Sequence, residues 1–273
     1  MRICLILLCF LTLTTGFAQE VSEISSKVQE DAYKKLEVKE FRFYPGGKIA
    51  ILSKVPGNIR IIGWEKSEVR VELEKIARGI SVDRAKSLFE KYPLYVRYNQ
   101  TSAKIGIEGS PSQLDDLEFN FEIYVPGYKT DLKATLDSGG ISVGEVNGWV
   151  EVSTGQGRLE AMALSGYYSG STQDGDILVE MSGRRWRGLE LGAITQTGSI
   201  DLLLPDDYSA SLQLETLDGN LTVDYPPQIV DGEPVPLNIG IKKKAQSLDA
   251  SIGSGGAPVR LVSQTGDIHL SVK

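Results

Sequence analysis

Short stretches in which apolar and polar residues alternate make up most of the chain. Residues 68–74 read EVRVELE, with an apolar side chain at every second position, which is the pattern of a strand with one buried face. Similar stretches follow one another from residue 38 onward, and Pro-Gly and Gly-Gly pairs separate them as turns. The pattern predicts an all-β protein whose N-terminal strands are irregularly spaced.

One segment has a helical pattern instead. The sequence predicts a short helix over Val82–Tyr92, with Ser81 as its N-cap and Pro93 directly after its end. Three apolar residues spaced three and four apart share one face of this helix: Ala85, Leu88 and Phe89. We expect that face to pack against the strands.

The glycines become periodic after residue 135. They recur every nine residues at Gly139, Gly148, Gly157, Gly166 and Gly175. On an 18-residue frame, a glycine followed by aliphatic residues at the third and fifth positions occurs in six copies, which begin at Gly139, Gly157, Gly175, Gly198, Gly219 and Gly266. A corner that needs positive φ or close backbone approach explains the recurring glycine.

The residue three positions before each of these glycines is also restricted. It is Leu136 in the first copy and threonine or serine in the other five: Thr154, Thr172, Thr195, Thr216 and Ser263. Repeats this short cannot bury enough surface alone, so they must stack and share one core. The repeats are clearest over 135–225, and residues 226–256, rich in Pro, Gly and Lys, are predicted to form a surface insertion.

The N-terminus has the pattern of an export signal. Residues 1–18 contain Arg2, an apolar run and small residues before Gln19, which predicts a cleaved signal peptide. A lipid anchor on Cys9 is the alternative, although Leu7 and Leu8 are bulky where that signal requires small residues. We therefore expect an exported protein, periplasmic or at the cell surface, with a polar lead-in at 19–37 and a single domain at 38–273.

The amino-acid composition excludes several kinds of metal-binding and catalytic site. Both cysteines lie in the predicted leader and His269 is the only histidine, which excludes Cys/His zinc sites, cysteine nucleophiles and Ser-His-Asp triads in the mature chain. The formal charge of −7 argues against nucleic acids and anionic membranes as partners. The sequence predicts no catalytic residues, no metal site and no cofactor.

Three motifs together resemble a bacterial family of exported β-strand repeats known as putative adhesins. They are the PGNIRIIGWEKSEV segment from Pro56, the strand that ends in Val125-Pro126, and the recurring Thr-x-x-Gly-Asp/Ser-Ile unit. The resemblance covers about residues 40–273 and implies a parallel, right-handed β-solenoid without established enzymatic activity. The insertion at 226–256 and an interrupted repeat near residue 183 depart from the family pattern.

The interruption contains the most distinctive cluster in the sequence, RRWR at 184–187. Cations around an indole can stack on sugars or bind acidic groups of an envelope polymer. With the two tyrosines one repeat earlier, the predicted surface patch consists of Arg184, Arg185, Trp186, Arg187, Tyr167 and Tyr168. The alternative is that Trp186 covers the core while the arginines remain solvated.

Other residues suggest more specific functions, such as calcium binding or catalysis, on weaker evidence. Aspartates at the corners could bind calcium, as in glycine-rich β-rolls, but aspartate is also a common turn residue: Asp137, Asp174, Asp176 and Asp218. The adjacent pairs Asp115-Asp116 and Asp206-Asp207 could serve a glycosidase only if loops turned both carboxylates to one side. His269 falls at an outward position of its repeat.

The sequence therefore favours a non-enzymatic adhesion or envelope-interaction module that binds envelope polysaccharide or another surface protein. Two alternatives remain: a carbohydrate-active enzyme on a β-helix, which would gather carboxylates with Arg or Lys in one groove, and a passive envelope scaffold that pairs edge to edge.

Overall fold

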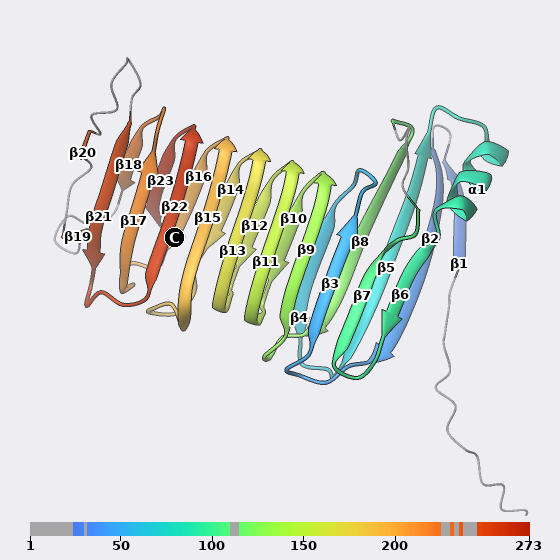
Figure 1. The fold of residues 1–273 in the computed structure, drawn as a ribbon, viewed down its shortest axis with the longest axis horizontal. Helices are drawn as coiled ribbons and strands as arrows, with labels where there is room; N and C mark the ends of the chain where they lie inside the picture. Colours follow the sequence, from blue (N-terminus) through green and yellow to red (C-terminus); the bar gives the residue numbers. More distant parts are fainter. Residues whose placement is uncertain (1–23, 30–31, 110–114, 225–229, 232–234, 237–244) are drawn as a thin grey trace, which may run out of the picture.

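The computed structural model describes residues 24–29, 32–109, 115–224, 230–231, 235–236 and 245–273. These residues form two large sheets and one helix, so the predicted all-β class is confirmed (Figure 1). In spatial order, sheet A contains β1 (Ile24–Gln29), β2 (Ala32–Arg42), β5 (Glu68–Arg78), β8 (Leu117–Pro126), β4 (Ile59–Trp64), β10 (Ile141–Gly144), β12 (Leu159–Met162), β14 (Ile177–Glu180), β16 (Ile200–Leu204), β23 (Ile268–Val272) and β18 (Leu221–Asp224).

Sheet B lies opposite sheet A. Its strands, again in spatial order, are β19 (Val230–Asp231), β21 (Gln246–Ile252), β17 (Ala210–Thr216), β22 (Pro258–Thr265), β15 (Gly188–Thr197), β13 (Ser165–Asp174), β11 (Asn147–Gln156), β9 (Asp131–Ser138), β3 (Lys48–Ser53), β7 (Ser102–Ile107) and β6 (Leu94–Tyr98), with β20 (Val235–Pro236) paired to β21.

The middle of the molecule follows the 18-residue repeat. From β9 to β16 the chain passes alternately from one sheet to the other, and each strand pairs in parallel with the strand one repeat later. Ile141 pairs with Leu159, and Leu159 pairs with Ile177, which is an offset of 18 residues at each step. Each repeat therefore adds one strand to each sheet.

Both ends of the molecule depart from parallel pairing. β1, β2, β5 and β8 pair antiparallel at one end, as do β6 and β7, and β17 pairs antiparallel with β21 at the other. Both sheets are therefore mixed. The predicted parallel solenoid is wrong as a description of the whole chain, because strands at both ends pair antiparallel. Two of these pairs, β1–β2 and β6–β7, are consecutive strands that pair as hairpins, which reverse the chain within one sheet.

The order of the repeats in space also differs from their order in the sequence. In sheet B, β3 lies between β7 and β9, and β22 lies between β15 and β17. In sheet A, β4 lies between β8 and β10, and β23 lies between β16 and β18. The repeat that begins at Gly266 therefore sits between those of Gly198 and Gly219. The run of repeats from β9 to β16 is therefore bordered on each side by a strand pair that is distant in the sequence.

Part of the predicted insertion at 226–256 belongs to the fold. Residues 246–252 form β21, which pairs along its whole length with β17, with Leu248 opposite Leu214. The prediction of a surface insertion is wrong for this segment, because alternate residues of β21 are buried and supply core side chains. Other parts of 226–256 lie outside the described residues, as does the predicted signal peptide.

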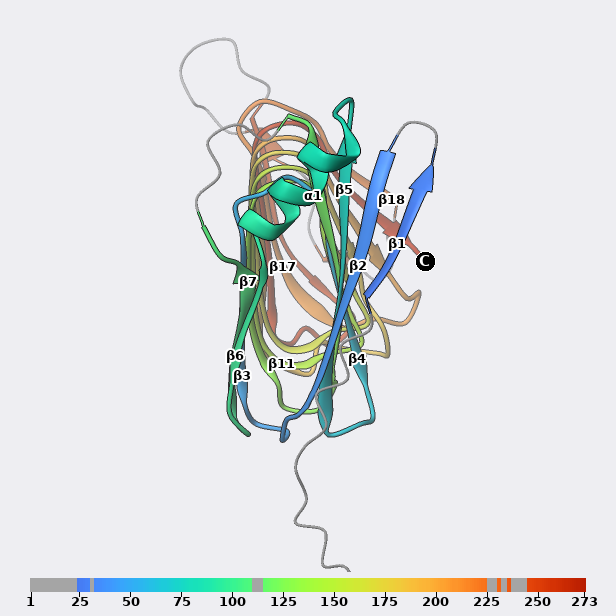
Figure 2. The same cartoon turned by 90° about the vertical axis from the view of Figure 1, so that its right-hand side faces the viewer.

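The one helix in the described part of the chain, α1, spans Val82–Lys91, one residue shorter than predicted. The hydroxyl of Ser81 accepts a hydrogen bond from the backbone N–H of Arg84, which confirms the predicted N-cap. Ala85 and Phe89 are buried on its inner face. Figure 2 shows α1 at one end of the molecule, across the space between the two sheets. No helix among the described residues is long and apolar enough to cross a membrane.

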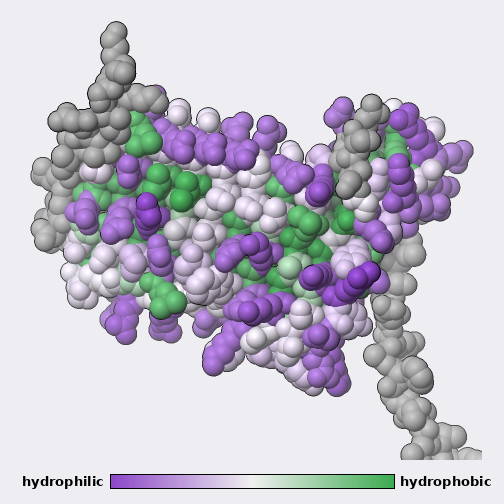
Figure 3. Space-filling view, viewed as in Figure 1, coloured by the Kyte–Doolittle hydropathy of each residue, from purple (hydrophilic) through white to green (hydrophobic). Residues whose placement is uncertain are grey.

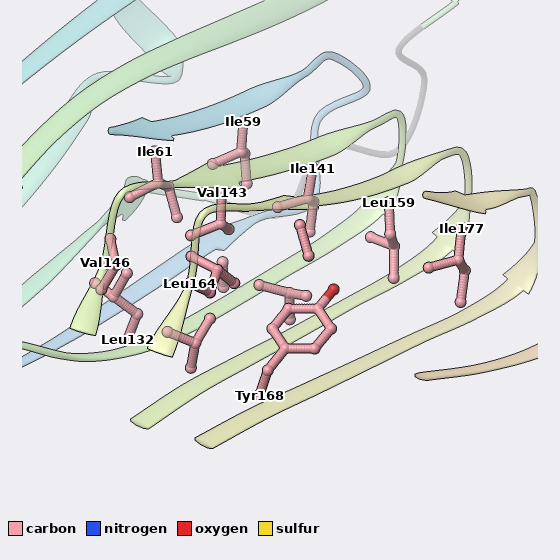
Figure 4. Packing of buried hydrophobic residues seen from close by; sticks show 14 of the residues in the cluster. Ile59, Ile61, Leu132, Ile141, Val143, Val146, Leu159, Leu164, Tyr168 and Ile177 are labelled. Carbon is pink, nitrogen blue, oxygen red and sulfur yellow. The ribbon is translucent and has the colours of Figure 1, made fainter. Parts of the chain in front are cut away.

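Inward side chains of the two sheets meet in one continuous core. Ile141, Leu159 and Ile177 form a row on sheet A, and Tyr168 points toward this row from sheet B (Figure 4). The ring of Tyr168 occupies the space beside Gly170, where an added Cβ would lie 2.4 Å from the tyrosine hydroxyl. Burial raises the pKa of this hydroxyl.

The recurring threonine has a structural role at each corner. Thr154, Thr172 and Thr195 are buried, and each donates its hydroxyl to the carbonyl oxygen of the corner glycine of the preceding repeat. Thr216 and Ser263 make the same bond to Gly266 and Gly198, which follows the spatial order of the repeats. The hydroxyls tie neighbouring corners together and give these partly buried carbonyl groups a hydrogen-bond donor.

We expect Thr172→Val to lower the free energy of unfolding by about 1–3 kcal/mol, because it leaves the Gly157 carbonyl without its hydroxyl donor while preserving side-chain shape. Thr172→Ser retains the hydroxyl and is the matched control. Urea unfolding followed by circular dichroism measures both. Equal stability of the valine variant and the wild type would contradict a stabilising role for the bond.

Candidate functional site

The predicted arginine–aromatic patch does not form as a single surface. Trp186 is only 6% exposed, and its indole Nε1 donates a hydrogen bond to the carbonyl of Gly166 at 3.2 Å. Tyr168 is fully buried in the core. Neither ring can therefore contact a ligand at the surface, because strand alternation and the corner after residue 183 turn both inward.

The three arginines of this segment remain exposed. Arg184 pairs with Asp207, with 3.0 Å between Nε and Oδ2. The arginines thus surround a tryptophan that faces away from solvent. Of the three aromatic residues in the predicted patch, Tyr167 alone has an accessible ring.

Tyr167 stacks on Trp149, a residue that the sequence analysis did not select. Their ring centroids are 3.9 Å apart with an interplanar angle of 21°, and Trp149 is 42% exposed. They lie on the outer face of sheet B, in register on the adjacent strands β11 and β13. Leu189, which is 69% exposed, lines the same hollow. We call Trp149, Tyr167 and Leu189 the aromatic site.

A signal for Trp149 was present in the sequence. Trp149 and Tyr167 are 18 residues apart, so they occupy the same position in consecutive repeats. Their neighbours Val150 and Tyr168 are buried, and alternation along a strand therefore turns Trp149 and Tyr167 outward. Comparing outward columns of the repeat, instead of looking for local clusters, would have found the pair.

Polar contacts fix the tryptophan in place. The indole Nε1 donates to the carboxylate of Glu151 at 2.8 Å, and the backbone N–H of Trp149 donates to Asp131 at 3.2 Å. Lys133 pairs with Glu151 at 3.1 Å. The hydrogen bonds from Trp149 and Lys133 hold the pKa of Glu151 below its ordinary value. The ring is thus preorganised in an exposed position.

Hollows flank the aromatic site on both sides. One, with a volume of about 390 Å³, is lined by glycines at the starts of the strands, together with Trp149, Tyr167 and Leu189: Gly46, Gly148, Gly166 and Gly188. The second, of about 490 Å³, borders Trp149 and extends over β9, β3 and β7. We call the second the lysine hollow; the side chains that line it above the strand backbones are Lys48, Ala50, Ser102, Lys104, Asp131, Lys133, Trp149 and Glu151.

Figure 3 shows the face of the molecule that carries sheet B, where hydrophobic surface is exposed between hydrophilic side chains. The glycines at the strand starts leave room beside the rings. At Gly148 an added Cβ would lie 2.1 Å from the carbonyl oxygen of Thr130, so close backbone approach excludes any side chain there. The same constraint that forms the corner keeps the aromatic site open.

A third groove, of about 530 Å³, lies on the outer face of sheet A near α1's end of the molecule. It gathers Glu72, Glu74 and Glu122 with Lys34 and Arg60, the combination that the enzyme alternative requires.

Each carboxylate in this groove already has a bonded neighbour. Glu74 pairs with Lys34 at 3.2 Å, Glu72 pairs with Arg70 at 2.6 Å, and Glu122 accepts a hydrogen bond from the hydroxyl of Tyr124. This arrangement resembles an outward ion-pair network more closely than an acid–base pair with separate environments.

The remaining candidates have local roles. Asp176 accepts a hydrogen bond from the backbone N–H of Ser199 at 2.8 Å, as turn aspartates do. In the described part of the chain no three His, Cys, Asp or Glu side chains are grouped to hold a metal ion. His269 lies outward between Asp201 and Asp224, with 3.0 Å between its Nε2 and Asp224.

The fold and site define a class: an all-β protein of two stacked sheets that presents an anchored aromatic pair on one outer face. No family model matches the chain, and no curated protein matches it.

Several solved structures are similar to this chain at low sequence identity. A putative cell adhesion protein from Clostridium sporogenes is 11% identical, with a TM-score of 0.42, over 87% of this chain and 100% of that one. A putative adhesin from Bacteroides fragilis is 11% identical, with a TM-score of 0.35, over 87% and 97% of the two chains. A putative lipid binding protein from Parabacteroides distasonis is 11% identical, with a TM-score of 0.24, over 86% and 96%. Putative adhesins are thus among the structures to which this chain is similar.

Proposed function

We propose that this protein is an exported, non-enzymatic adhesion module that binds envelope polysaccharide through the aromatic site. The observation that carries the proposal is the exposed Trp149–Tyr167 stack, held by Glu151 and Asp131 and flanked by two hollows. Sugar rings present apolar C–H faces and polar edges, and an anchored tryptophan beside carboxylates and amines complements both. The fold that displays this site is, in the proposal, a right-handed parallel β-solenoid closed by antiparallel strands at its ends.

Exposure of these rings is otherwise unfavourable. An aromatic side chain left in water forgoes the stabilisation of about 2–3 kcal/mol that burial gives. Tyr168 and Trp186 of the same region are buried, whereas the indole of Trp149 is held in an exposed position by its hydrogen bond to Glu151. A preorganised ring loses little conformational entropy on binding, which suits a recognition surface.

Trp149→Ala is expected to weaken binding to envelope polysaccharide by about 30-fold or more, as truncation of a central aromatic contact removes at least about 2 kcal/mol. Pull-down and isothermal titration against purified peptidoglycan and capsular polysaccharide measure the loss. Folding should be retained, because Trp149 lies outside the core.

Trp64→Ala is the matched control. Trp64 also faces outward and stacks on a tyrosine, Tyr124, with centroids 5.2 Å apart, but it lies on sheet A. Its loss should leave binding unchanged. Equal affinity of Trp149→Ala and the wild type would remove the aromatic site from the proposal.

The proposal prefers binding to catalysis because the carboxylates of the sheet A groove are held in ion pairs and hydrogen bonds with their neighbours. Release of reducing ends from the bound polysaccharide, lost in Glu72→Gln or Glu122→Gln, would instead support the enzyme alternative.

A further inference from the structure

Two exposed lysines line the hollow beside the open side of Trp149. Tyr167 covers one face of the indole, and the ring borders the lysine hollow on the side away from Tyr167. Lys48 on β3 and Lys104 on β7 line this hollow and are exposed. Within the described part of the chain, neither lysine forms a salt bridge, whereas Lys133 is paired with Glu151. This is notable in a chain with a formal charge of −7.

The strand register places these cations around a residue with a short side chain, Ala50, at the bottom of the hollow. Ala50 lies between Lys104 and Lys133, one strand from each, and its short side chain leaves the space between them open. In the neighbouring column Lys48 lies between Ser102 and Asp131, and Asp131 is next to Trp149. The cations therefore stand along the sides of a hollow that begins at the aromatic ring.

The dimensions suit a short run of sugar units. Lys48 is two strands from Trp149, and Lys104 lies three strands away, which correspond to about 10 Å and about 14 Å at a strand spacing of roughly 4.8 Å. A chain stacked on Trp149 and extended across the strands passes over the floor at Ala50. Acidic groups on its next units would meet Lys48 and Lys104.

We infer that the ligand of this site is an anionic polysaccharide, with a sugar ring stacked on Trp149 and carboxylates bound by Lys48 and Lys104. The inference rests on the proposed function and names its ligand class. A neutral glycan would use the ring but leave both ammonium groups without a partner. A nearby lysine supplies a flexible point charge, which fits acidic groups spaced along a polymer better than a single rigid anion.

Polygalacturonate and the same polymer after carboxyl reduction are the two probes. Titration calorimetry should show wild-type protein binding polygalacturonate roughly tenfold more tightly than the reduced polymer, with a difference that shrinks as salt rises. Lys48→Gln/Lys104→Gln should lose this difference and bind the reduced polymer as the wild type does. Lys54→Gln/Lys86→Gln removes two exposed lysines elsewhere and should behave as wild type.

Failure of this inference can be distinguished from failure of the proposed function. Suppose that Trp149→Ala no longer binds either polymer but Lys48→Gln/Lys104→Gln still prefers polygalacturonate. The proposed role of the two lysines is then overturned, and the aromatic site stands. If the wild type binds both polymers equally, the anionic ligand class is overturned. If it binds neither polymer nor any envelope polysaccharide, the proposed function falls and the inference with it.

Discussion

Gly157→Val is expected to cost about 4 kcal/mol or more of the free energy of unfolding, a large fraction of the 5–15 kcal/mol typical of a folded protein. Gly157 has a φ of +139°, a conformation that valine adopts only under strain. A Cβ at this position would lie 2.2 Å from the carbonyl oxygen of Gly139 in the preceding repeat. The neighbouring atom is backbone, so the clash can be relieved only by separating two repeats.

Gly192→Val is the matched control for this experiment. Gly192 lies in β15, on the outer face of sheet B, and an added Cβ there would meet its nearest neighbouring atom at 3.9 Å, an ordinary contact. Valine also has a higher strand propensity than glycine, so this variant should be at least as stable as the wild type. Thermal unfolding followed by circular dichroism compares the two. Similar melting temperatures for both variants would show that the corner tolerates a side chain.

Lys75→Met is expected to destabilise the protein by about 3 kcal/mol, because it removes one partner from a buried charge network. Lys75 has no exposed surface, and its ammonium group bonds the carboxylate of Glu37 at 3.0 Å. It also donates to the carbonyls of Tyr92 at 2.8 Å and Phe89 at 3.2 Å, at the end of α1. The lysine thus joins sheet A to the last turn of the helix, where carbonyl groups need donors.

The pH dependence of stability gives a second measurement of this network. Burial raises the pKa of Glu37, but hydrogen bonds and charge from Lys75 and Lys35 outweigh burial and leave that pKa below its ordinary value of 4.5. A lowered carboxyl pKa contributes stability that is present above about pH 4.5 and is lost as the pH falls further. The wild type should therefore lose more stability on acidification than Lys75→Met.

Burial lowers the pKa of Lys75 despite the opposing effect of Glu37. The unfolded chain then holds the lysine proton more tightly, so this group alone makes stability rise as the pH approaches 10.5 from below. Lys34→Met removes a half-buried lysine on the outer side of the same sheet and should change stability by less than about 1 kcal/mol. If Lys34→Met and Lys75→Met prove equally stable, the buried network does not stabilise the helix.

The nine-residue spacing of the glycines in the sequence corresponds to two interleaved series of glycines in the structure. Gly139, Gly157 and Gly175 stack at the corner from sheet B to sheet A, whereas Gly148 and Gly166 stack at the start of the strands of sheet B. Each series has an 18-residue period, and their offset produces the interval of nine. The periodicity could be predicted from the sequence because backbone contact between repeats forbids a side chain at both places.

The partner of each corner threonine could not be predicted in the same way. Sequence order places Gly219 after Gly198, but Ser263 bonds Gly198 and Thr216 bonds Gly266. The last strand pair, β22 and β23, enters the stack between strands formed by earlier residues. Strand pairing of this kind depends on which open edges the rest of the chain leaves, and the repeats are too alike to specify their neighbours.

The sequence by itself determined the all-β class, the helix with Ser81 as its N-cap and the positions of the corner glycines. These follow from alternation, capping and backbone sterics, which act between near neighbours or at every copy of a repeat. Tertiary structure alone decided that Trp186 is buried and Trp149 exposed, and that Lys48 and Lys104 share a hollow with that ring. The physical reason is that a surface is assembled across strands: Lys48, Lys104 and Trp149 come to line one hollow only because β3, β7 and β11 take nearby places in one sheet.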